Sequence, residues 1–315
     1  MAAVPLCLVR RRGWPALVPL GAGISDYTDV LLTENTAAIR DVLTTALLAE
    51  PGWRLLELPE LRPDALALHW TAEWPGRVTQ MPGATSLELP GVPLDVLLAR
   101  LPGRTASVIR RKLRKTDALG VVSSQVPVER TVDAVTAMLK LHEEQWRGRG
   151  INAEHLTRRF VEHLTGALPQ MVADGQAVVV EHRLDGEMLG SQVNLVGHDL
   201  LGYYLAGISP RLKERIDVAS LLIRGDVEMT VEHGLCRYSL MRGEEDYKLR
   251  WRPERIEHTR LICARPGIVG AAGYPAMLRA KQTLQGWIRT ARRLPTSRTA
   301  LVTALRSIRG AATGS

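Results

Sequence analysis

The chain has 315 residues, of which 45% are hydrophobic and 23% are charged, values typical of globular proteins and sufficient for two ordinary domains or one large one. No apolar run reaches the length of a membrane span, and the three cysteines form no CxxC pair, so we expect a cytoplasmic protein in a reducing compartment. Ten basic and no acidic residues lie in 258–315, which leaves 31 basic against 33 acidic residues elsewhere, so the net charge of +8 describes the C-terminal tail and is weak evidence for nucleic-acid binding.

The first hundred residues are rich in proline and glycine. Residues 21–32 indicate a turn followed by an apolar segment. The spacing of apolar residues predicts a helix over 36–48, and 53–61 predict a short buried strand. The stretch 89–103 has proline and glycine at both ends and is the expected domain boundary.

Two helices are predicted next, a basic one over 107–120 and an amphipathic one over 129–150, with His142 and Trp146 on the apolar side of the second. Asn152 is expected to cap a third helix that runs to about residue 173. A histidine on an apolar helix face is usually a core residue. Since no second histidine stands at metal-ligand spacing, we predict no metal site.

An antiparallel meander is predicted over 176–183, 190–197 and 200–209, with Asp185-Gly186 as its first hairpin turn. A helix over 217–233 follows and ends at Gly234, and strands are predicted at 237–241 and 255–264. This order indicates a mixed α/β layer with a crossover helix. The tail from Tyr274 predicts two helical pieces broken at Pro295.

Three cations (Arg211, Lys213, Arg215) precede the predicted helix start at 217–220. Free amides, the helix dipole and these cations would suit a pyrophosphate. The alternative is a solvated loop capped by Asp217, because no glycine lets a phosphate approach the backbone there.

The stretch LMRGEEDYKLRW (240–251) follows the fourth predicted strand. Tyr247 is a candidate acid, and Glu244 and Glu245 are candidate bases if burial raises their pKa values. Arg242 and Lys248 could hold an anion or pair with these acids. Alone, such a run is often a salt-bridged turn, but neighbouring strand ends commonly line a cleft.

Polar residues also lie on the predicted central strands. Gln192 and Asn194 share one face of the second strand, and Tyr203 and Tyr204 lie on the third. They either line a substrate groove or satisfy one another. The six cations of 104–115 could bind the phosphates of RNA or another anionic ligand, or form a solvated helix face.

Five pieces of the chain carry a family resemblance: SVIRRKLRKTDALG, LHEEQWRGRG, DGEMLGSQVNL, YYLAGISP and, most specifically, RGEEDYKLRW. The chain resembles GNAT-fold acyltransferases, in particular the CelD-like branch named for cellulose biosynthesis, which is related to the Fem-type aminoacyl transferases. The resemblance covers about 104–264 and, more faintly, 19–61. It implies a mixed α/β fold of tandem GNAT-like halves, with a truncated half over 1–100, a complete one over 101–267 and a basic helical tail over 268–315.

The resemblance also implies roles for individual residues. The third and fourth strands would splay to admit the pantetheine arm of acetyl-CoA or another acyl-CoA, a co-substrate and not a tightly bound cofactor. The implied donor-binding residues are Leu205, Ala206, Gly207, Arg215, Val218, Ala219 and Ser220. Tyr247 would protonate the leaving thiolate, and Glu244 would take a proton from the amine. The implied substrate-binding residues are Trp146, Gln192, Asn194, Tyr203, Arg242 and Lys248.

The leading expectation is therefore an N-acyltransferase that acts on a small-molecule or carrier-bound amine, in polysaccharide or secondary-metabolite biosynthesis. Val218 and Ala219 stand where the family's phosphate loop has glycine, which puts CoA binding in doubt. A Fem-type transferase using charged tRNA and a non-catalytic GNAT-like binding module remain alternatives. The apolar stripe at Trp287, Ile288, Ala291 and Leu294 could lie on an anionic membrane surface, or dock on the chain's own body.

Overall fold

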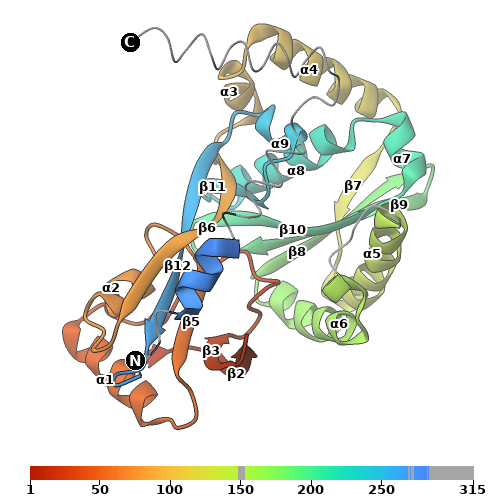
Figure 1. The fold of residues 1–315 in the computed structure, drawn as a ribbon. Helices are drawn as coiled ribbons and strands as arrows, with labels where there is room; N and C mark the ends of the chain where they lie inside the picture. Colours follow the sequence, from red (N-terminus) through yellow and green to blue (C-terminus); the bar gives the residue numbers. More distant parts are fainter. Residues whose placement is uncertain (148–152, 269, 271–272, 282, 284–315) are drawn as a thin grey trace, which may run out of the picture. The chain divides into compact units, whose positions relative to one another are not determined.

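The computed structural model describes residues 1–147, 153–268, 270, 273–281 and 283. The chain divides into two compact units (Figure 1). Unit 1 comprises 1–22, 27–82 and the described residues from 259 on, and unit 2 comprises 23–26 and 83–258. Among the described helices, none is long and apolar enough to cross a membrane.

Unit 1 contains a small mixed sheet flanked by two helices. Its strands are β2 (Leu6–Arg11), β3 (Trp14–Pro19), β5 (Leu55–Leu61), the part of β12 (Glu254–Ala264) from residue 259 and the part of β6 (Val78–Pro90) up to residue 82, in that order, and β3 and β5 run parallel. A two-residue pair, β1 (Ala2–Ala3) with β4 (Leu31–Leu32), lies apart from it. Helices α1 (Ala37–Ala49) and α2 (Leu66–Ala72) pack on β5 and β12 around Trp53, Trp70 and Trp74.

Local sequence explains much of unit 1. Thr36 caps α1 by accepting a hydrogen bond from the backbone N–H of Ile39, and every residue of β5 is buried, as its apolar run predicts. The predicted helix at 36–48 and strand at 53–61 are confirmed. The hairpin of β2 and β3, which turns at Arg12 and Gly13 with positive φ, and helix α2 were not predicted.

Unit 2 is built on a larger sheet. The order is β6 (Val78–Pro90, from residue 83), β11 (Arg237–Arg242), β10 (Leu200–Ile208), β9 (Glu187–Val196), β8 (Ala177–Leu184) and β7 (Val122–Gln125). All neighbours are antiparallel except β10 and β11, which run parallel and are joined by the crossover helix α8 (Val218–Glu232). The hairpin between β8 and β9 turns at Asp185 and Gly186, both with positive φ.

Helices cover both faces of the unit 2 sheet, because alternate residues of its strands point in opposite directions (Figure 1). Ala177 and Val179 of β8 pack with α5 (Thr131–Trp146) and α6 (Arg158–Ala173). Val178 and Val180 pack with the opposite layer, formed by α3 (Leu94–Ala99), α4 (Gly103–Ala118) and α8. Short helices α7 (Pro210–Arg215) and α9 (Asp246–Leu249), with 3-10 turns η1 (Val128–Arg130) and η2 (Ala153–Leu156), complete the unit.

The predicted meander, its crossover helix and the two strands after it are confirmed, each within a few residues of its expected ends. The stretch 89–103, expected to be a boundary, holds the end of β6 and helix α3, which belong to the same unit as α4. Asn152 and the predicted tail stripe lie outside the described residues. The N-cap of α6 is Thr157, whose hydroxyl accepts a hydrogen bond from the backbone N–H of Phe160.

Candidate active site

The site forms where β10 and β11 part. The two strands pair only through Leu200–Gly202 and Arg237–Ser239, and the β10 register against β9 shifts between Tyr203 and Leu205. Gly202 stands at the point of parting, where a Cβ would lie 2.1 Å from the Cε of Met241. A side chain at residue 202 would therefore displace the end of the Met241 side chain. The strand opening that the resemblance implied is present in unit 2.

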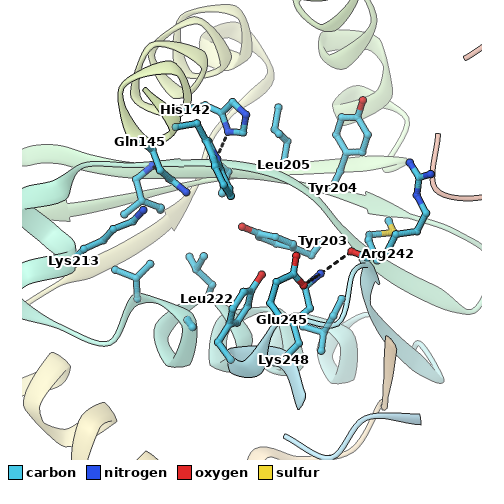
Figure 2. Close-up of a pocket in the computed structure, with 18 of the residues that line it drawn as sticks. His142, Gln145, Tyr203, Tyr204, Leu205, Lys213, Leu222, Arg242, Glu245 and Lys248 are labelled. Carbon is cyan, nitrogen blue, oxygen red and sulfur yellow. Dashed lines mark hydrogen bonds and ion pairs between the residues drawn. The ribbon is translucent and has the colours of Figure 1, made fainter. Parts of the chain in front are cut away.

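A hollow of about 640 Å³ lies in this opening. Its wall residues come from α5, η2, β10, the segment from α7 into the start of α8, the end of β11 with α9, and Asp26. Figure 2 shows Tyr203 and Tyr204 leaving β10 on opposite sides, Tyr203 toward the Glu245 and Lys248 side chains and Tyr204 away from them. Of the donor and substrate residues expected from the sequence, eight line the hollow: Trp146, Tyr203, Leu205, Ala206, Val218, Ala219, Arg242 and Lys248.

The α8 start carries a neutralised carboxylate. Asp217, the N-cap residue, accepts hydrogen bonds from Lys112 Nζ at 2.7 Å, Arg250 at 3.1 Å and the Ser220 hydroxyl at 2.9 Å. Burial alone would raise the pKa of Asp217, but the hydrogen bonds from Lys112 and Ser220 and the charge of Arg250 hold it below its usual value. Val218 and Ala219 follow at the first two helical positions, whose amides have no intrahelical acceptor, and both line the hollow.

Two residues that were expected to bind the acyl donor do not line the hollow. Ser220 is fully buried and its hydroxyl is donated to Asp217, so it is not a wall residue. Arg215 also lies outside the wall, with its guanidinium 3.8 Å from the Asp185 carboxylate in a largely exposed pair. The cation of α7 that does line the hollow is Lys213, because Lys213 and Arg215 point to different sides of this short helix.

The segment after β11 is held by a buried lysine. Lys248 is 4% exposed and donates to the Arg242 carbonyl at 2.8 Å, while its Nζ lies 2.9 Å from Glu245 Oε2 (Figure 2). Arg242 pairs in turn with Asp26, at 2.7 Å. Lys248 and Arg242 thus fix the loop that presents Tyr247 to the hollow.

Tyr247 and Glu244, the two expected catalytic residues, are placed differently. Tyr247 lines the hollow, and although the residue is 38% exposed, burial around its phenol raises the pKa well above the usual value, as does the neighbouring Glu245. Glu244 points away, since its carboxylate pairs with Arg255 and it is not a wall residue. Gly243, with φ of 104°, turns the chain so that Glu245 and not Glu244 faces the hollow.

Backbone groups of β10 face α5 at the open edge. His142 Nδ1 lies 2.8 Å from the Ala206 carbonyl, and the Ile208 N–H donates to Gln145 Oε1 at 3.0 Å. In a strand the N–H and C=O of one residue point the same way, so the Ala206 N–H also faces this edge. Gly207 is not a wall residue. A Cβ there would lie 2.0 Å from the Met138 carbonyl oxygen, so glycine allows α5 to approach β10.

Gln192 and Asn194 do not reach the hollow. Both are buried, and their side-chain amides each donate to Asp226 Oδ1 at 2.6 Å, while the Tyr238 hydroxyl donates to Oδ2 at 2.7 Å. Burial raises the pKa of Asp226 to about 7 against the effect of these three donors. The two residues expected to bind substrate are therefore hydrogen-bond partners of the Asp226 carboxylate on α8. The sequence signal for this contact was an acidic residue, Asp226, within the apolar pattern of 218–232.

Two histidines in the wall were not expected there. His142, interpreted from the sequence as a core residue, lines the hollow with His155 of η2, and its Nε2 lies 3.3 Å from His155 Nδ1. A second hollow, of about 400 Å³, shares five wall residues with the first: Asp26, His155, Tyr204, Leu205 and Arg242. Sequence gave no signal for this pair, because the two histidines are on different elements.

Residues 103–249 match the family described as acetyltransferase (GNAT) domain. No curated protein matches the chain in sequence. The solved structures that are similar to most of the chain include the following three. The C-terminal domain of a putative lysylphosphatidylglycerol synthetase from Agrobacterium fabrum is 12% identical, with 89% of this chain and 87% of that one covered and a TM-score of 0.56.

The other two are FemX and L-PGS from Bacillus licheniformis. FemX is 12% identical, with 82% and 88% coverage and a TM-score of 0.56, and L-PGS is 10% identical, with 85% and 82% coverage and a TM-score of 0.52. At such identities the likeness shows the fold. Each covered share exceeds unit 2 alone, so the likeness includes much of unit 1. The chain therefore has the predicted GNAT-type mixed α/β fold, and its residues 103–249 are similar in sequence to the acetyltransferase (GNAT) domain, which supports acyl transfer as the general chemistry.

Proposed function

We propose that the protein is an N-acyltransferase that moves an acetyl or other acyl group from acyl-CoA to an amine in a ternary complex. The observation that carries this proposal is the hollow at the parting of β10 and β11, whose wall includes the start of α8 and Tyr247. The match of 103–249 to the acetyltransferase domain family supports it. As the sequence resemblance suggested, we place the chain near the CelD-like branch.

The start of α8 would bind the pyrophosphate of the donor. The amides of Val218 and Ala219 supply hydrogen bonds, and the helix dipole favours an anion there. The Asp217 carboxylate would repel phosphate, but Lys112 and Arg250 both contact it, so the three side chains together carry a net positive charge. Lys213 adds a second cation to the wall. This arrangement would compensate for the missing glycines.

The reaction forms a C–N bond and breaks a C–S bond. The neutral amine attacks the thioester carbonyl carbon, and the carbonyl oxygen gains a negative charge that the Ala206 N–H would stabilise. As the tetrahedral intermediate collapses, the thiolate leaves and takes a proton from the Tyr247 hydroxyl. The raised pKa of Tyr247 keeps that proton available at neutral pH. The proton of the amine passes to a base in the wall.

Calorimetry with acetyl-CoA tests the donor site. We expect Lys213→Ala to weaken binding about 5-fold, the loss of about 1 kcal/mol from a solvent-exposed charge contact. Arg215→Ala is the matched control, since Arg215 is on the same helix but outside the wall, and it should leave the affinity unchanged. If the two substitutions changed the affinity for acetyl-CoA equally, the start of α8 would not be the pyrophosphate site.

Acetyl transfer tests the acid. Tyr247→Phe removes the proton donor and keeps the ring, so we expect kcat to fall about 100-fold or more while acetyl-CoA binds as before. A Tyr247→Phe protein with turnover near that of the native protein would contradict the role. Glu244→Gln should have little effect, because the Glu244 carboxylate is held by Arg255 outside the wall.

A second function, Fem-type aminoacyl transfer from charged tRNA, is favoured by one surface. Five exposed cations lie on and beside α4, whose Lys112 reaches the α8 start: Arg104, Arg110, Arg111, Arg114 and Lys115. A gel shift with tRNA that weakens steeply with salt, and that is lost on Arg110→Ala/Arg114→Ala substitution, would support tRNA as donor. Binding of neither acetyl-CoA nor tRNA would leave a non-catalytic binding module.

The location and further partners follow from the same proposal. We propose a cytoplasmic protein that acylates a small-molecule or carrier-bound amine in polysaccharide or secondary-metabolite biosynthesis. Peripheral membrane contact through the basic tail is a separate proposal, which liposome co-sedimentation with and without residues 274–315 would test. Equal pelleting of the two proteins would refute it.

A further inference from the structure

The contacts of His142 fix the proton positions on two neighbouring imidazoles. A carbonyl oxygen can only accept, so His142 Nδ1, at 2.8 Å from the Ala206 carbonyl, carries a proton. In the neutral ring the other nitrogen, Nε2, is then an acceptor. His155 Nδ1 lies 3.3 Å from it and donates. The neutral His155 ring consequently has its lone pair on Nε2.

Both rings are held in the neutral form. Burial lowers the pKa of His142, and Lys213 lowers it further against the Ala206 hydrogen bond. Burial also lowers the pKa of His155, with His142 acting in the same direction and Asp26 and Glu154 opposing it. Tyr204, also in the wall, stays uncharged because burial raises its pKa to about 12. A neutral imidazole with one lone pair is a base at neutral pH.

His155 lies where the two hollows meet. It is one of five wall residues that the 640 Å³ and 400 Å³ hollows share, together with Leu205, next to the Ala206 amide at the open strand edge. The second hollow also contains the Asp26 carboxylate, which is paired with Arg242. An amine that enters through the second hollow would meet His155 before it reaches a thioester in the first. The ring of His155 is further fixed by stacking on Phe160, with centroids 4.7 Å apart.

We propose that His155 is the general base that takes the proton from the acceptor amine, and that His142 is a positioning residue that fixes the tautomer of His155 through the Ala206 carbonyl. This inference rests on the proposed acyl transfer. The acceptor arrives as an ammonium ion, and its N–H proton moves to His155 Nε2. The freed nitrogen lone pair then attacks the thioester carbonyl carbon. Tyr247 supplies a different proton, to the departing sulfur. The attacking nitrogen loses its second proton to the resulting tyrosinate, so the products are the amide, the CoA thiol and a protonated His155.

The test compares His155→Gln with His163→Gln, a matched control on exposed α6 surface. Initial rates are measured with acetyl-CoA and the best acceptor from a screen of glucosamine, free lysine and a lysine-containing peptide. We expect His155→Gln to lower kcat by 10²–10⁴-fold at pH 7, with acetyl-CoA affinity unchanged. The deficit should shrink near pH 10, where a primary amine loses its proton without help. His163→Gln should stay within about 2-fold of the native rate, as expected for a surface change without a structural role.

Two further variants separate catalysis from structure. His155→Ala should regain activity when imidazole is added, which a folding defect would not. His142→Asn, whose amide can still donate to the Ala206 carbonyl, should move the acidic limb of the pH profile of kcat/KM, because the partner of His155 Nδ1 is lost. A purely structural role for His142 would change the rate without moving the profile.

Retention of at least a third of the native kcat by His155→Gln, with an unchanged pH profile, would overturn the proposal and favour Glu245 as the base. If the native protein itself transfers no acetyl group, the proposed function has failed instead. In that case ¹⁵N–¹H correlation spectra of the histidine side chains, which show the tautomer of each ring, test the inference independently. Nδ1–H forms of both His142 and His155 would support it, and an Nε2–H form of either would refute it.

Discussion

Asp226 offers a sharp test of how burial and hydrogen bonding compete in this fold. Its carboxylate is fully buried on α8 and receives hydrogen bonds from Gln192, Asn194 and Tyr238. Burial nevertheless raises its pKa from 3.8 to about 7. We expect Asp226→Asn to stabilise the protein above pH 7, because the amide fills the same space without a charge. Its Nδ2 can donate to the Tyr238 oxygen, whose own proton can rotate away.

The magnitude follows from the pKa change. Between pH 4 and pH 7 the folded protein keeps a proton that the unfolded chain has released, so the free energy of unfolding falls as the pH rises. A rise from 3.8 to about 7 corresponds to about 4 kcal/mol, of which about 2 kcal/mol falls between pH 5 and pH 7. The native protein should lose this stability over that range. Asp226→Asn should not.

Urea denaturation of both proteins at pH 5, 6, 7 and 8, followed by circular dichroism, measures the difference. His142, His155 and His182 have lowered pKa values, so they add stability as the pH rises, but they are common to both proteins and cancel in the comparison. Glu232→Gln, an exposed change on the same helix, is the control. Parallel stability curves for the native protein and Asp226→Asn would refute the reasoning, since Asp226 would then titrate alike in the folded and unfolded states.

Three other changes probe the packing around the site and in unit 1. Gly207→Ala places a Cβ 2.0 Å from a backbone carbonyl of α5, so we expect a loss of about 1–3 kcal/mol or more in denaturation, and a stability equal to the native protein's would contradict the close approach of α5. Lys248→Met leaves the carbonyl at the end of β11 without its donor and should cost about 1–3 kcal/mol, seen as a lower Tm; an unchanged Tm would mean that the loop does not need this contact. Trp74→Phe removes the hydrogen bond from the indole N–H to the Ala264 carbonyl, at 2.7 Å, and should cost a similar amount; protection of the Ala264 region in hydrogen exchange as strong as in the native protein would speak against it.

The candidate site was only partly predictable from the sequence. The run at 242–248 pointed to Tyr247, Arg242 and Lys248, and the structure places all three in the wall of the hollow. It could not distinguish Glu244 from Glu245, since that choice depends on the positive φ at Gly243 and on Arg255, which holds the Glu244 carboxylate.

Contacts between distant segments explain the remaining differences. Gln192 and Asn194 alternate on one strand face as a substrate groove would require, but their partner is Asp226, more than thirty residues away. His142 looks like a core histidine until η2 brings His155 beside it. In both cases the sequence shows the residue type and its position on its own element. It does not show which residue of another element lies against it.

The sequence by itself determined the local elements of this protein: the cap at Thr36, the hairpin turn at Asp185 and Gly186, the end of α8 before Gly234, and the order of the strands in the meander. These features depend on residues within about one turn of each other, whose capping, φ preference and apolar spacing act in the chain itself. Only the tertiary structure decided the parting of β10 from β11, the burial of Asp226 and the pairing of two histidines, because each arises from packing between elements far apart in the sequence.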